Sequence, residues 1–110
     1  MIRAEFVIQD NKILSFSVEG HSGLAQSGED ILCASVSAMS QLVINTLTEV
    51  FIAELDLLID EKKPLIRCSL KSVSEEKRNG AEGILYGFYL QMKDLSEIYS
   101  AHLTVRTKSK

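Results

Sequence analysis

Little in this sequence points to a disulfide, a membrane or a nucleic acid. Its 110 residues include no tryptophan, one proline and two cysteines, and the formal net charge is only −3. Two cysteines are too few for the disulfide framework of a small secreted domain. No apolar run approaches the ~18–20 residues that cross a bilayer, and the charged N-terminus lacks the apolar core of a signal peptide. We expect a cytoplasmic protein with free thiols and no membrane contact.

The distribution of charges and the spacing of the cysteines and histidines exclude two further classes of function. The 15 acidic and 12 basic residues are scattered along the chain, whereas a nucleic-acid-binding protein usually carries a basic face. The two cysteines and two histidines lie far apart, in no spacing known for a metal site. We therefore expect no direct nucleic-acid binding and no metal.

The hydrophobic pattern predicts a single folded domain over residues 1–110. Hydrophobic residues make up 45% of the chain, which is enough for a core, and no linker or repeat divides it. Alternating apolar and polar residues predict strands at residues 2–9, 14–19, 64–70 and 102–108. The apolar segment at residues 55–60 is a further strand candidate, separated from the next by a charged turn. The polar residues 10–12 join the first two strands as a hairpin, with Leu14, Phe16 and Val18 facing the core.

Two segments repeat apolar residues at steps of three and four, which predicts amphipathic helices. The first begins after Asp30, a good N-cap residue, and ends near residues 51–54; its inward stripe is Leu32, Val36, Met39, Val43, Leu47 and Val50. The second follows a polar loop at residues 71–80 and spans residues 81–99. The order ββαββαβ predicts an α/β (α+β) fold, in which two helices cover one face of a mixed, mostly antiparallel sheet.

One stretch, "GHSGLAQSGEDILCASVSA" at residues 20–38, holds both a histidine and a cysteine. With Asp30 as cap, Cys33 is the third residue of the helix, where the helix dipole and the unpaired N–H groups favour a thiolate. His21 directly follows Gly20 at the end of the second strand. If the loop at residues 22–29 folds back, His21 and Cys33 form the nucleophile–base pair of a cysteine hydrolase.

The same residues have simpler interpretations, and spacing alone does not decide between them. Cys33 can be a small buried apolar residue, His21 a surface turn residue and Asp30 an N-cap rather than a residue that orients His21. Ser37 lies on the same flank of the helix as Cys33. Cys68 alternates with apolar neighbours and is expected in the core.

The segments "EGHSG" and "GEDILCASVSA" resemble the ribosomal-processing cysteine protease family, Prp. The matching positions are Gly20, His21, Asp30, Ile31, Cys33, Ala34 and Ser37. The chain length and the order of elements match more loosely. Ser22 stands where alanine is common in the family and Leu32 where valine is; neither departure touches the expected chemistry.

The resemblance implies a cysteine endopeptidase with Cys33 as nucleophile and His21 as general base, which requires no cofactor. Ser37, Asp30 and Gly20 would have supporting or substrate-positioning roles. It further implies that the protein is a homodimer and removes a short N-terminal extension from a large-subunit ribosomal protein. The alternative is a non-enzymatic ribosome-associated assembly or binding module. A thiol redox sensor is disfavoured because no resolving cysteine lies near Cys33 in the sequence.

Overall fold

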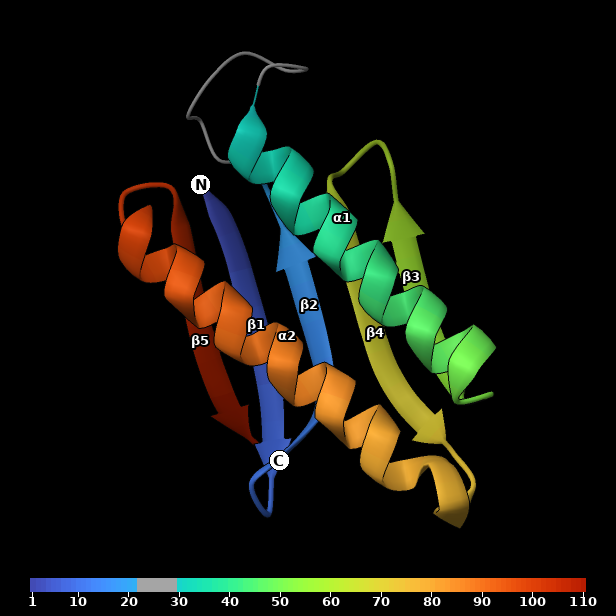
Figure 1. Ribbon diagram of the computed structural model, residues 1–110. Helices are drawn as coiled ribbons and strands as arrows, with labels where there is room; N and C mark the ends of the chain where they lie inside the picture. The colour runs from blue at the N-terminus through green and yellow to red at the C-terminus, as the bar shows by residue number, and fades with distance from the viewer. Residues whose placement is uncertain (22–29) are drawn as a thin grey trace.

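The computed structural model describes residues 1–21 and 30–110, and these form one sheet with two helices on one of its faces (Figure 1). The helices are α1 (Ile31–Asn45) and α2 (Arg78–Ile98). The five strands are β1 (Ile2–Gln9), β2 (Lys12–Glu19), β3 (Glu54–Asp60), β4 (Leu65–Ser72) and β5 (Leu103–Ser109). They lie in the order β3-β4-β2-β1-β5, and the β1–β5 pair is parallel while the other pairs are antiparallel. The predicted mixed sheet and the order ββαββαβ are confirmed.

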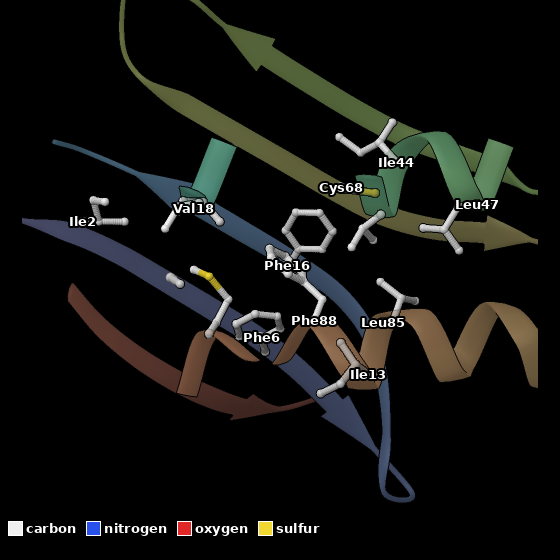
Figure 2. Packing of buried hydrophobic residues seen from close by; sticks show 14 of the residues in the cluster. Ile2, Phe6, Ile13, Phe16, Val18, Ile44, Leu47, Cys68, Leu85 and Phe88 are labelled. Carbon is white, nitrogen blue, oxygen red and sulfur yellow. The ribbon is translucent and has the colours of Figure 1, made fainter. Parts of the chain in front are cut away.

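The core lies between the sheet and the two helices. Alternation along β1 and β2 turns one face of each strand inward, and both strands contribute a phenylalanine that meets a third from α2 (Figure 2). The ring centroids of Phe16 and Phe88 are 4.9 Å apart and those of Phe6 and Phe88 are 5.6 Å apart, both edge to face. Aromatic pairs of this geometry add about 0.5–1.5 kcal/mol each beyond the area that they bury.

The first hairpin contains an irregularity that changes which residues of β2 face the core. Asp10 and Asn11 both have positive φ, as the two central residues of a tight hairpin turn require. The register shifts between Val7 and Ile8, so that Ile8 pairs with Ile13 and Val7 with Ser15. This irregularity buries Ile13 completely and leaves Leu14 half-buried. The prediction that Leu14 faces the core with Phe16 is therefore wrong.

The helix α1 presents its predicted stripe to the sheet except in its last turn. Leu32, Val36, Val43 and Leu47 are buried, whereas Val50 is exposed. The cause is a π-helical turn at Thr46–Val50: its wider turn rotates the end of the stripe away from the core. Ser40 is fully buried within the stripe, and its hydroxyl donates a hydrogen bond of 2.8 Å to the Val36 carbonyl.

The polar loop predicted at residues 71–80 is shorter in the structure. Strand β4 continues to Ser72, and a 3-10 turn at Glu75–Lys77 leads directly into α2 at Arg78. The first turn of α2 begins with polar residues, so the apolar pattern of the sequence did not indicate where this helix starts. Gly80 lies in that turn because a side chain there would overlap the ring of Phe51.

By length and hydropathy alone, and contrary to the expectation from its sequence, the helical segment Ile31–Val50 is apolar enough to span a membrane. The core helix of a folded domain meets the same criteria. Here the inward residues of the segment, Leu32, Val36, Val43 and Leu47, pack into the core against the sheet.

Candidate active site

A cleft opens at the end of the sheet where β2 ends and α1 begins. It has a volume of about 310 Å³ and lies between the first three turns of α1 and the β3–β4 hairpin. Apolar residues form much of its lining: Ile2, Val18, Val36, Ile59, Pro64, Leu65 and Ile66. Cys33 and His21 both reach this cleft, so the fold brings the predicted nucleophile and the predicted base to one cavity.

Cys33 is held by the cap of α1. The Asp30 carboxylate accepts a hydrogen bond of 2.9 Å from the Cys33 amide, and Asp30 has the extended backbone of an N-cap residue. Cys33 is therefore the third helical residue, as predicted, and is partly buried at the edge of the apolar stripe. Because its amide is engaged by Asp30, this N–H group is not available to an oxyanion while the cap is intact.

Gly20 fixes the position from which His21 reaches the cleft. The Gly20 amide donates a hydrogen bond of 2.9 Å to the Pro64 carbonyl, which ties the end of β2 to the β3–β4 hairpin. Its φ is +95°, in the region that favours glycine, and a Cβ at this position would overlap the backbone carbonyl oxygen of Met1. The next residue, His21, is exposed.

Four of the five predicted site residues line the cleft: Gly20, His21, Cys33 and Ser37. Asp30 is not among the lining residues and is buried as the cap of α1. Its position favours the N-cap interpretation over a role at the cleft surface. The loop at residues 22–29, which was expected to fold back and bring His21 to Cys33, lies outside the described residues.

The β3–β4 hairpin supplies a wall of the cleft that sequence reasoning missed. Ile59, Asp60 and Pro64 belong to this wall. One carboxylate oxygen of Asp60 accepts hydrogen bonds of 3.0 and 3.1 Å from the amides of Lys62 and Lys63 and so fixes the turn. The single proline marked a turn in the sequence, but nothing local indicated that this turn lies opposite the head of α1. Among residues 1–21 and 30–110, no group of three or more histidine, cysteine, aspartate or glutamate side chains could hold a metal ion.

The two cysteines are expected to react at very different rates. Burial raises the pKa of the Cys68 thiol to about 11, and its side chain lies in the core. Cys68 is therefore almost wholly in the unreactive thiol form at neutral pH, whereas Cys33 borders the cleft. We expect iodoacetamide at pH 7 to alkylate Cys33 at least about tenfold faster than Cys68, measured by peptide mass spectrometry. Equal rates in the folded protein would argue against a reactive Cys33.

Three comparisons connect this arrangement to known proteins. The model of the family described as cysteine protease Prp matches residues 1–104. The Bacillus subtilis (strain 168) protein named ribosomal processing cysteine protease Prp is 28% identical over 101 residues, covering 89% of this chain and 88% of that protein. The crystal structure of the S. aureus ribosomal processing protease Prp with a covalently linked product peptide has a TM-score of 0.87, at 20% identity over 98% of this chain and 100% of that one. The SMU.848 protein of Streptococcus mutans has a TM-score of 0.86, at 24% identity over 100% and 96%. These structural likenesses establish the same fold.

Proposed function

The chain belongs to the cysteine protease Prp family, and from that premise we propose that it removes a short N-terminal extension from a large-subunit ribosomal protein. The observation that carries the proposal is the cleft at the head of α1, which Cys33 and His21 both line. The name of the Bacillus subtilis relative supports a ribosomal protein as the substrate.

In the proposed reaction, Cys33 attacks the carbonyl carbon of the scissile peptide bond. His21 accepts the thiol proton and then delivers it to the leaving amine as the C–N bond breaks. The product is an acyl-enzyme with a thioester at Cys33. Water then attacks the thioester with His21 again as base, which releases the new carboxylate and restores the thiol.

The surroundings of the dyad have supporting roles in this proposal. The apolar lining of the cleft suits an apolar or aromatic side chain next to the scissile bond. Ser37 is placed to contact the peptide or Cys33, and Asp30 orders the start of α1 through its bond to the Cys33 amide. The proposed enzyme acts in the cytoplasm as a homodimer.

A direct test uses a synthetic peptide that reproduces the N-terminal extension and the first mature residues of the organism's own ribosomal protein. We expect the purified protein to cut this peptide at one bond, detected by mass spectrometry, and to leave a scrambled peptide intact. Binding without cleavage would instead favour the assembly or binding module that the sequence left open.

A further inference from the structure

Strand β3 has an unusual composition for a strand at a sheet edge. Among the described strands it forms one edge of the sheet. Three consecutive apolar side chains, Leu57, Leu58 and Ile59, have exposed fractions of 43%, 47% and 44%. Proteins usually protect free edges with charge, because unpaired backbone groups beside apolar side chains invite another strand. The opposite edge, β5, follows that rule with Arg106 and Lys108. In β3 the charged residues lie only before and after the apolar run, which itself carries no charge.

The apolar side chains of β3 project from both faces of the sheet. Leu57 pairs with Cys68, which is buried on the helix side. Leu58 pairs with Arg67, one residue along β4 and therefore on the opposite face. Exposure on both faces does not suit a partner that packs on one side of the sheet. It suits a strand that continues the sheet, whose alternate side chains lie above and below.

The same strand leads into the active-site cleft. Its last two residues, Ile59 and Asp60, line the cleft together with Cys33. Figure 1 shows that β3 ends at the end of the sheet where α1 begins. A segment paired with β3 would therefore run toward the end of the sheet where the cleft opens, and its continuation past the β3–β4 turn would approach the cavity that Cys33 lines.

We propose that the peptide substrate adds to the free edge of β3 as a further strand, so that main-chain hydrogen bonds to β3 guide the scissile bond toward Cys33. This inference rests on the proposed proteolytic function. Backbone pairing supplies affinity and alternate side chains supply specificity in strand addition. The charged residues of β3, Glu54, Asp56 and Asp60, are all acidic. The occupant is accordingly an extended apolar segment without carboxylates.

An N-methyl scan of the substrate peptide tests the backbone pairing. In a strand, every other N–H points toward the neighbouring strand, and N-methylation removes that donor and adds bulk. We expect kcat/KM to fall about tenfold or more at alternate positions and to change little at those between. A scan without this period of two overturns the proposal, provided that the unmethylated peptide is cut. If the unmethylated peptide is not cut, it is the proposed function that fails.

A pair of protein variants tests the location. Leu58 lies on the face of the sheet opposite the helices and is 47% exposed, so an occupant of the strand edge would contact it without its touching the cleft. We expect Leu58→Ser to raise KM about fivefold, and Ile98→Ser, an exposed position at the end of α2, to leave it unchanged. Equal KM values for both variants overturn the proposal. A changed oligomeric state in sedimentation with unchanged KM also overturns it, and assigns the edge to a second copy of the chain.

Discussion

Replacing Cys33 with alanine is expected to reduce peptide cleavage at least about a thousandfold, because no other group in the proposed reaction forms the acyl-enzyme. His21→Ala is expected to cost a similar factor. The double variant should be little worse than either single one, since residues that act as a unit are not additive. Steady-state kinetics on the ribosomal-protein peptide measure these losses.

The matched control is the other cysteine. Cys68→Ala should keep cleavage within a few-fold of the unmodified protein, because Cys68 lies in the core away from the cleft. Far-UV circular dichroism and peptide binding should remain normal for Cys33→Ala, whose side chain is only partly buried. If a folded Cys33→Ala protein still cleaved the peptide, Cys33 could not be the nucleophile.

The second large effect is expected at Gly20. The Cβ of an alanine at this position would overlap the Met1 carbonyl oxygen, and its backbone would have to keep a φ of +95°, which alanine rarely adopts. We therefore expect Gly20→Ala to lower the free energy of unfolding by about 1–3 kcal/mol. Relief of that strain moves the backbone that bonds to Pro64, and with it His21. Cleavage should therefore fall by more than the loss of folded protein explains. Urea unfolding and kinetics on the same preparation separate the two effects.

Gly87 provides the control for this substitution. It lies within α2, and a Cβ there would have no neighbour within 4 Å among the described residues. Gly87→Ala should raise the free energy of unfolding by about 0.5–1 kcal/mol, since alanine is the better helix former, and should leave cleavage unchanged. If Gly20→Ala were as stable and active as Gly87→Ala, the described position of Gly20 would not matter to the site.

Much of the fold is encoded locally, and its elements could be predicted for that reason. Period-two alternation in β1 and the cap at Asp30 depend only on neighbouring residues. The predictions of which residues face the core failed where contacts between distant segments or an irregular backbone determine the orientation of a side chain. The register shift in the first hairpin buried Ile13 in place of Leu14, and the π-helical turn rotated Val50 into solvent.

The site was predictable to a similar extent. The motif around His21 and Cys33 placed both residues correctly at the end of β2 and the start of α1. The opposite wall was not predictable, because it depends on β4 pairing with β2 across the intervening α1 and β3. That pairing is what brings Pro64 within hydrogen-bonding distance of Gly20.

A crystal structure with the ribosomal-protein peptide bound would test the central claim most directly, through the distance between the His21 imidazole and the Cys33 sulfur. We predict a ring nitrogen roughly 3–4 Å from the sulfur, with the scissile carbonyl beside it. If the bound peptide left the two side chains on opposite sides of the cleft, with another side chain at the scissile bond, the proposed mechanism would be wrong.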